Sequence, residues 1–202
     1  MTTDGIGERK AALRREAKAR RDALPTARRI EASFAMAEHA LAVLAFDAGT
    51  VISAYLPIGS EVDPRPLMAA LADRRARLAV PAIVAGDLEF RELLRDGVLE
   101  PQGFGTHAPG EGAAKLDPAI MLVPMLAFDR KRARIGYGKG FYDRAIARLS
   151  LIHPRLVTVG LAFAAQEAPA VPTDAQDRRL DLVITESEVL APSASASEPE
   201  RR

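Results

Sequence analysis

A glycine-rich segment lies between an apolar run and a helical pattern, and this order constrains the fold more than any other feature of the chain. The segment is Gly136-Tyr137-Gly138-Lys139-Gly140. The run before it, residues 119–128, is nearly all apolar and predicts a buried strand, whereas residues 141–149 have apolar side chains at helical spacing. A strand, a glycine loop and a helix in succession predict an α/β fold with a ligand site at the loop.

The glycine loop has the residue types of a phosphate-binding site. Glycine allows positive φ and a close approach to the backbone, so successive amide groups can face one anion. The N-terminus of the following helix favours negative charge, and Lys139 adds a cation. Asp143 would repel a phosphate unless a cation such as Mg²⁺ stood between them. The alternative is a glycine-rich surface turn in which Asp143 stabilises the helix N-terminus.

Length and composition predict one domain. The chain has 202 residues, of which 48% are hydrophobic, and we expect a single core within residues 1–190. Residues 191–202 are rich in Pro, Ser, Ala and Glu and predict a disordered tail. The 28 basic and 27 acidic side chains give a formal net charge of +1, which disfavours a broad nucleic-acid surface or a strongly electrostatic membrane contact.

Several classes of chemistry are excluded or disfavoured. The chain has no cysteine, which excludes disulfides, thiolate catalysis and cysteine zinc sites. His39, His107 and His153 have no second histidine at metal-ligand spacing, so we expect surface or capping roles for them. No secretory signal or membrane-spanning run is evident. We expect a cytoplasmic protein without nucleic-acid or membrane partners, as a monomer or weak homodimer.

The remaining pattern alternates strands and helices. Two helices come first, residues 8–24 and a helix from Thr26 with Ile30, Phe34, Ala37, Leu41 and Leu44 on one face. Strands are predicted at 50–56, 77–81, 87–93, 119–128, 155–161 and 180–185, helices at 64–75 and 141–149, and an irregular connection at 95–117. This order favours a mainly parallel sheet flanked by helices, with ligands beyond the carboxyl ends of its strands.

Four motifs carry a resemblance to a known family. Residues 123–129, Val-Pro-Met-Leu-Ala-Phe-Asp, followed by the segment 134–144, closely resemble the signature of the 5-formyltetrahydrofolate cyclo-ligase family. The resemblance extends to Lys10-x-x-x-Arg14, to Tyr55-Leu56-Pro57-x-x-x-Glu61, and to the stretch from Val171-Pro172 through Asp177, Asp181 and Glu186. Two departures are that residues 104–109 lack a glutamate frequent in the family, and that Gln176 stands where a histidine is frequent.

The resemblance implies a fold, a reaction and a set of site residues. The fold would be a Rossmann-like sheet of the CoA-transferase type. The reaction would convert 5-formyltetrahydrofolate to 5,10-methenyltetrahydrofolate with ATP and Mg²⁺, through a phosphorylated formyl intermediate, releasing ADP and phosphate. The implied site is Lys10, Arg14, Arg134, Ile135, Gly136, Tyr137, Gly138, Lys139, Gly140, Phe141 and Tyr142 for ATP; Leu56, Glu61, Tyr137 and Gly138 for the folate; Asp143 and Asp181 for the metal; and Lys139 and Arg134 for catalysis.

Other interpretations stay open for parts of this site. Lys10 and Arg14 share one helix face, but they are also typical of a solvated, charged helix. Tyr137 and Tyr142 are equally suited to stacking on a ligand ring and to packing beside the loop. For the whole chain, the alternatives are a sugar-phosphate isomerase or group-transfer protein that works without ATP, and a module whose helix 8–24 binds RNA.

Overall fold

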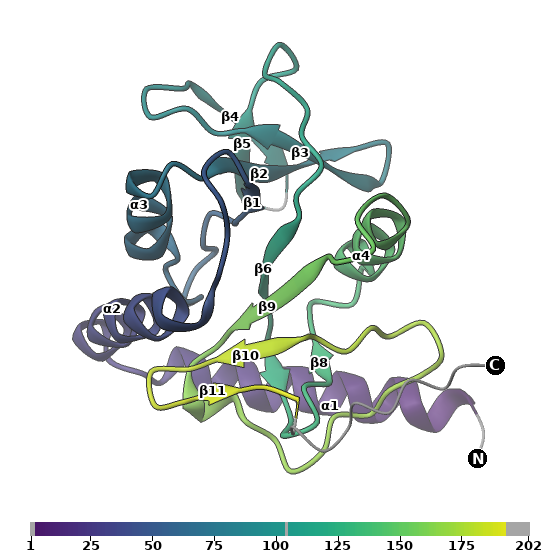
Figure 1. Ribbon diagram of the computed structural model, residues 1–202. Coiled ribbons are helices and arrows are strands. Elements are labelled where there is room, and N and C mark those ends of the chain that lie inside the picture. Colours follow the sequence, from purple (N-terminus) through teal and green to yellow (C-terminus); the bar gives the residue numbers. More distant parts are fainter. Residues whose placement is uncertain (1–2, 104, 193–202) are drawn as a thin grey trace, which may run out of the picture.

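The computed structural model describes residues 3–103 and 105–192, which form a mixed sheet with helices around it (Figure 1). The helical elements are α1 (Thr3–Asp22), α2 (Thr26–Val43), α3 (Arg65–Asp73), α4 (Phe141–Ile152) and the 3₁₀ turn η1 (Ala164–Gln166). The strands of the large sheet are β1 (Val51–Ser53), β2 (Arg77–Val84), β3 (Asp87–Glu92), β6 (Ile120–Pro124), β9 (Val157–Leu161), β10 (Leu182–Ile184) and β11 (Val189–Leu190). Two hairpins lie apart from it, β4 (Leu99–Gly103) with β5 (Thr106–Pro109), and β7 (Ala127–Phe128) with β8 (Arg134–Ile135).

The large sheet is mainly parallel. Its strand order in the described chain is β11-β10-β9-β6-β1-β2-β3, in which the strands from β10 to β2 are parallel to their neighbours. The edge strands β11 and β3 pair in the antiparallel direction. The prediction of a mainly parallel α/β sheet flanked by helices is confirmed.

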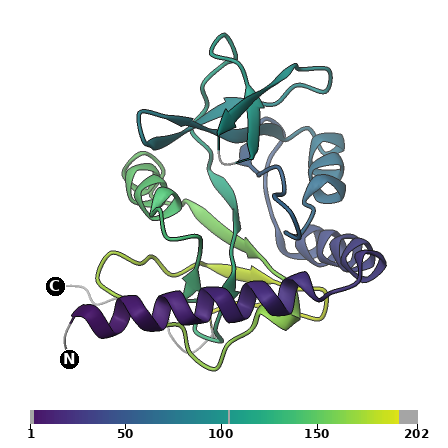
Figure 2. The same cartoon turned by 180° about the vertical axis from the view of Figure 1, so that it is seen from behind.

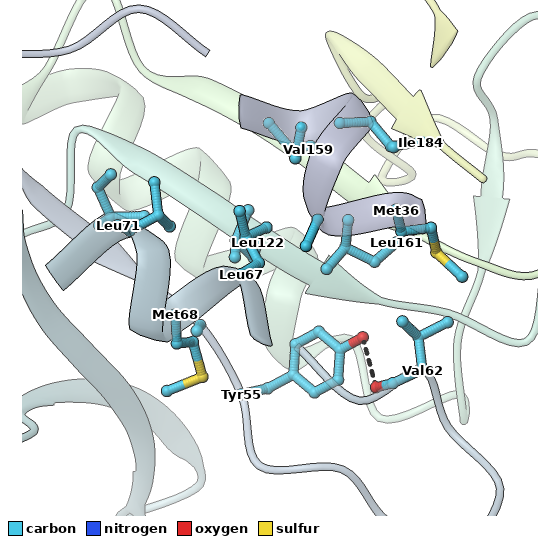
Figure 3. Packing of buried hydrophobic residues seen from close by; sticks show 14 of the residues in the cluster. Met36, Tyr55, Val62, Leu67, Met68, Leu71, Leu122, Val159, Leu161 and Ile184 are labelled. Atoms are coloured by element: carbon cyan, nitrogen blue, oxygen red, sulfur yellow. Dashed lines mark hydrogen bonds between the residues drawn. The ribbon is translucent and has the colours of Figure 1, made fainter. Parts of the chain in front are cut away.

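The apolar run of β6 explains why this strand is central. Its side chains alternate between the faces of the sheet, so Ile120 and Leu122 pack in the cluster formed with α2 and α3, while Met121 and Val123 pack in the cluster formed with α4. Figure 3 shows the first of these clusters, where Leu122 lies beside Leu67 of α3. Both faces are therefore covered, which gives three layers.

Helix α1 lies outside these layers, across the edge where the central strands end. It contacts η1, which follows β9, and strand β7, which follows β6. Ala17 on its inner face is fully buried and packs with Leu126 and Ile135. Figure 2 shows α1, in purple, crossing in front of this edge of the sheet. Helix α1 is thereby placed at the carboxyl ends of the strands.

Two predictions about strands were wrong in detail. The connection 95–117 is not irregular throughout, because it contains the β4–β5 hairpin. The strand predicted at 119–128 is two strands, since β6 ends at Pro124 and β7 begins at Ala127. Proline has no N–H to donate to a ladder, so a continuous strand through Pro124 is disfavoured.

Helix boundaries and faces also differ from expectation. Helix α1 begins at Thr3 instead of residue 8. In α2, Ile30 and Phe34 are 54% and 58% exposed, and the helix packs through small residues instead: the buried side chains are Ala32, Ser33, Met36, Ala37 and Ala40. Alanines let a helix approach its neighbours closely. The rest of the predicted face is confirmed, because Ala37 and Leu44 are buried and Leu41 packs against the same cluster.

The predicted tail, 191–202, lies outside the described residues except for its first two. The Ala191 carbonyl accepts a hydrogen bond from Arg132 Nη1 at 3.1 Å. Phe104, within the segment that departs from the family pattern, also lies outside them. None of the helices in residues 3–103 and 105–192 has the length and apolar character needed to cross a membrane.

Candidate active site

The strand order creates a switch point between β1 and β6. The chain continues from β1 to β2 on one side of the sheet, and from β6 through β9 to β10 on the other. Segments leaving the carboxyl ends of two such strands diverge, and the space between them is where open α/β sheets bind ligands. Here those segments are residues 54–61 and residues 125–140, which contain Glu61 and the glycine loop.

The glycine loop is formed by backbone conformations that suit glycine. Strand β8 ends at Ile135, and Gly138 and Gly140 have φ values of 92° and 66°, with Gly140 as the N-cap of α4. Arg14 Nε donates to the Gly136 carbonyl at 2.9 Å, and Arg144 Nη1 donates to the Lys139 carbonyl at 3.0 Å. Carbonyl groups of the loop are thus held by arginines.

Two amide groups of the loop have no hydrogen-bond acceptor among the described residues. Among the described residues, the amides of Gly136 and Gly138 donate to no other protein group. The loop leads directly into the N-terminus of α4, whose first-turn amides add to the positive potential. Amide groups without a protein acceptor at this place are what an anion-binding loop requires.

The predicted loop residues divide into packed and accessible ones. Ile135 is 3% exposed, and Phe141 and Tyr142 pack against the apolar cluster beneath α4. Burial raises the pKa of Tyr142 far above its ordinary value, which favours the packing interpretation for this side chain. Tyr137 is 49% exposed, and Lys139 is exposed as well.

Two of the predicted cations lie on the inner face of α1. Lys10 and Arg14 are four positions apart, about one helical turn, so both point toward the body of the protein. Arg14 reaches the glycine loop, as described above. Lys10 Nζ instead lies 2.7 Å from Asp174 Oδ2 and 2.6 Å from Asp177 Oδ2. Burial lowers the pKa of Lys10, but the hydrogen bonds with Asp174 and Asp177 outweigh it and the net shift is upward.

Arg134 and Asp143 form an ion pair beneath the loop. Arg134 Nη2 lies 3.0 Å from Asp143 Oδ1, and its side chain is 5% exposed. The same oxygen accepts a hydrogen bond from the Arg178 amide at 3.1 Å. The hydrogen bonds of Asp143 within the described chain all end on Oδ1, which leaves Oδ2 open to a ligand. The structure places Arg134 as a support for Asp143; its contact with a phosphate stays a prediction.

Asp181 lies at the amino end of β10. Its Oδ2 accepts hydrogen bonds from the amide and the hydroxyl group of Thr158, each at 2.7 Å. Arg178, three residues earlier, donates to Asp143, so residues 178–181 run between the two carboxylates. Within the described residues, no three His, Asp or Glu side chains are grouped to hold a metal. The metal-binding role of Asp181 stays a prediction.

Glu61 is a buried carboxylate on the other side of the switch point. It is 7% exposed, and its Oε2 accepts a hydrogen bond from the Ile58 amide at 2.9 Å. Its Oε1 is buried and meets no donor at hydrogen-bond geometry in the described chain, although the Tyr137 hydroxyl is near enough to the carboxylate to lower its pKa. Burial raises the pKa of Glu61, and the Ile58 amide, Arg21 and Tyr137 offset this only in part. A buried acceptor without a donor is costly unless a ligand completes it.

The negative charge of this carboxylate acts on all the tyrosines of the chain. The chain has three tyrosines, Tyr55, Tyr137 and Tyr142, and all three interact electrostatically with Glu61. Tyr55 is 3% exposed and donates to the Val62 carbonyl at 3.2 Å, as the dashed line in Figure 3 shows. Leu56, also predicted at the folate site, is partly buried against the α2–α3 cluster. A buried carboxylate with a tyrosine of the glycine loop near it suits a heterocycle with N–H donors.

Arg21 is a site residue that the sequence reasoning missed. It lies in the last turn of α1, is 2% exposed, and its Nη1 lies 3.9 Å from Glu61 Oε1. A sequence signal was present, because Lys10, Arg14, Ala17 and Arg21 follow the spacing i, i+4, i+7 and i+11 that defines one helix face.

Comparisons with known proteins match this chain over most of its length. The family model described as "5-formyltetrahydrofolate cyclo-ligase family" matches residues 6–186. A mouse (Mus musculus) protein named 5-formyltetrahydrofolate cyclo-ligase is 25% identical over 199 residues, which cover 92% of this chain and 98% of the relative. A relative of the same name from Mycolicibacterium smegmatis is 33% identical over 138 residues, covering 62% and 70%.

Two solved structures have the same fold. The NMR structure of Aquifex aeolicus 5,10-methenyltetrahydrofolate synthetase has a TM-score of 0.77 at 26% identity, covering 96% of this chain and 98% of that one. The 5,10-methenyltetrahydrofolate synthetase from Mycoplasma pneumoniae has a TM-score of 0.70 at 22% identity, covering 88% and 98%. At 22% identity, the similarity to the Mycoplasma pneumoniae structure supports the fold alone.

Proposed function

Because the chain belongs to the 5-formyltetrahydrofolate cyclo-ligase family, we propose that it converts 5-formyltetrahydrofolate to 5,10-methenyltetrahydrofolate, consuming ATP in the presence of Mg²⁺. One observation carries the proposal. The buried Glu61 Oε1, which meets no donor at hydrogen-bond geometry in the described chain, lies near Tyr137, a residue of the glycine loop suited to phosphate. An acceptor for the folate and a cradle for the nucleotide thus share one edge of the sheet.

The folate side of the site rests on Glu61. The pyrimidine half of the reduced pterin is flat and has an amino group and a ring N–H on one edge, which are donors for a carboxylate. Ionised Glu61 can accept from this edge through Oε1, while Oε2 is held by Ile58. Tyr137 lies near this carboxylate and would contact the ring, and the family resemblance adds Leu56, which is partly buried against the α2–α3 cluster.

The nucleotide side rests on the loop. Its amide groups and the N-terminus of α4 can receive the phosphates of ATP, and Lys139 supplies a cation on an exposed part of the loop. Arg14 already contacts this loop through Gly136. Lys10 is one turn away, and a phosphate must compete with Asp174 and Asp177 for it.

The chemistry needs activation of a poor leaving group. The formyl oxygen of the substrate attacks the γ-phosphorus of ATP, so an O–P bond forms, the bond to the bridging oxygen breaks and ADP leaves. Nitrogen 10 then attacks the activated formyl carbon and loses its proton, and phosphate departs with the former formyl oxygen. Phosphoryl transfer depends on positioning and charge stabilisation, which the loop amides and Lys139 supply without a side-chain nucleophile.

Mg²⁺ fits the residues next to the loop. Asp143 Oδ2 is open while Oδ1 is held by Arg134 and Arg178, so the carboxylate is fixed but retains a ligand oxygen. Mg²⁺ commonly takes one or two carboxylates and completes its shell with phosphate oxygens and water. Bound there, it would neutralise charge on the phosphates of ATP.

The proposal is tested by the near-ultraviolet absorbance of the methenyl product. Purified protein is mixed with 5-formyltetrahydrofolate, with ATP and Mg²⁺ each present or withheld. An absorbance rise that needs both supports the proposal. A rise without ATP would replace it with an ATP-independent activity, and no rise with folded protein and intact substrate would refute it.

A further inference from the structure

We propose that Arg21 is a positioning residue for the folate: it holds Glu61 and Tyr137 in the arrangement that receives the pterin ring. The inference rests on the proposed function and adds a residue to it that lies outside the motifs of the family resemblance. It is carried by the contacts of one buried guanidinium group with both sides of the switch point.

The guanidinium of Arg21 joins three segments of the chain. Nη2 donates to the Tyr137 hydroxyl at 2.9 Å, Nε donates to Ser60 Oγ at 3.0 Å, and Nη1 lies 3.5 Å from the Met125 carbonyl. Ser60 is the neighbour of Glu61, and Tyr137 belongs to the glycine loop. A single side chain of α1 therefore fixes the distance between the Glu61 segment and the loop.

The geometry toward Glu61 differs from an ordinary ion pair. Arg21 Nη1 is 3.9 Å from Glu61 Oε1, too far for a hydrogen bond, although both side chains are almost fully buried. The positive charge can stabilise the carboxylate while Oε1 keeps its capacity to accept from a ligand. A close, bidentate pair would have occupied the acceptor that the pterin needs.

The orientation of Arg21 is itself fixed. The Ser60 hydroxyl, which accepts from Arg21, donates to Asp22 Oδ1, and Asp22 also pairs with Lys18 in the same helix. These hydrogen bonds tie the last turn of α1 to the segment before Glu61. Because Arg14 lies on the same helix, the folate pocket and the nucleotide loop share one rigid support.

Arg21 is the group that offsets the negative charge of Glu61. The ionisable groups that interact with Glu61 are Arg21 from α1, Tyr55 after β1, Tyr137 in the loop and Tyr142 in α4. Arg21 is the cation among them in the described chain. Its removal leaves the buried carboxylate uncompensated, so Glu61 would become protonated at higher pH and would accept hydrogen bonds less well.

The test compares folate and nucleotide binding by calorimetry in Arg21→Met and Arg21→Lys. For Arg21→Met we expect the Kd for 5-formyltetrahydrofolate to rise roughly tenfold or more, and the Kd for ATP to change less than about twofold. As the pH is lowered, the folate affinity of this variant should begin to fall at a higher pH than that of the unaltered protein. Arg21→Lys keeps the charge and should recover part of the affinity. Arg15→Met, on the exposed face of α1, is the control.

A double variant separates positioning from general stability. If Arg21 acts through Glu61, then Arg21→Met should have little further effect on folate affinity in a Glu61→Gln background. If the unaltered protein turns over its substrate but Arg21→Met and Arg21→Lys keep its folate affinity and pH dependence, the Arg21 inference is overturned while the proposed function stands. Equal losses of folate and ATP affinity would also overturn the Arg21 inference. If Arg21→Met does not fold, Arg21→Lys decides by the same criteria. Absence of folate binding by the unaltered protein would overturn both proposals.

Discussion

Arg14 Nε donates to the Gly136 carbonyl at 2.9 Å, and its guanidinium carbon would lie only 3.1 Å from a Cβ atom added to Gly138. The arginine of α1 thus occupies the space that a side chain at position 138 would need. Contact between the N-terminal helix and the glycine loop depends on this residue being glycine.

Gly138→Ala is therefore expected to disturb the loop. The φ of 92° at position 138 is disfavoured for alanine, and this backbone strain alone costs about 1–3 kcal/mol. The added methyl group would also push against Arg14. We expect a lower free energy of unfolding in urea and a KM for ATP raised about tenfold. Gly136→Ala is the matched control, because its Cβ would meet no atom within 4 Å. Equal effects of the two variants would contradict the conclusion that the contact between Arg14 and the loop requires glycine at position 138.

Lys139→Ala should lower turnover more than binding. We propose that Lys139 stabilises charge on the transferred phosphoryl group, and loss of one such group typically lowers kcat about a hundredfold. The kcat and KM of the variant, measured by product absorbance, check this. Lys131→Ala, at an exposed position in the β7–β8 turn, serves as the control. A Lys139→Ala variant with the kcat of the unaltered protein would remove this residue from the mechanism.

Lys10 is held by two carboxylates that a phosphate must displace. If Lys10 moves to the nucleotide, then Lys10→Met should weaken ATP binding, whereas the double variant Asp174→Asn, Asp177→Asn should strengthen it several-fold by releasing the cation. Isothermal calorimetry with ATP measures both. Weaker ATP binding in the double variant would show that Lys10 works from its paired position.

The sequence predicted the parts of this protein that rest on local patterns. Consecutive residues define the apolar run of β6, the glycine loop and the start of α4 at Phe141. The family resemblance is also confirmed. Longer-range features were less visible. The face of α2 was predicted correctly at Ala37, Leu41 and Leu44 but not at Ile30 and Phe34. Apolar residues occur around much of that helix, and packing against α3 and the sheet decides between them.

Arg21 illustrates the same limit within the site. In sequence it is one of several arginines in a charged helix, and only its place on the helix face of Lys10 and Arg14 distinguishes it from the exposed Arg15. Its role depends on Ser60 and Tyr137, which are 39 and 116 residues away along the chain. Such contacts follow from the topology of the sheet, which brings the segments after β1 and β6 together.

Asp143→Asn is expected to raise the Mg²⁺ concentration needed for half-maximal turnover, by about tenfold. The amide oxygen can still accept from Arg134 and the Arg178 amide, so the fold should persist while the negative ligand is lost. Titration of Mg²⁺ into chelator-treated protein measures this, with Asp181→Asn in parallel and the exposed Asp117→Asn as control. An unchanged Mg²⁺ requirement in Asp143→Asn would exclude it as a metal ligand.

Glu61 should make folate binding depend on pH. Burial raises the pKa of this carboxyl above the ordinary value of 4.5, so it becomes protonated at a higher pH than an exposed glutamate. Because the ionised form is the better acceptor, affinity for 5-formyltetrahydrofolate should be highest near pH 8 and fall as pH drops through the raised pKa. Calorimetry between about pH 5 and about pH 8 measures this.

The matched variant isolates this carboxyl group. Glu61→Gln cannot ionise, so it should bind the folate about tenfold more weakly near pH 8 and lose the inflection that Glu61 contributes. Glu16→Gln, on the exposed face of α1, should retain both the affinity and the pH dependence of the unaltered protein. The same inflection in Glu61→Gln would assign the titration to another group, and an unchanged affinity at pH 8 would mean that the folate does not contact Glu61.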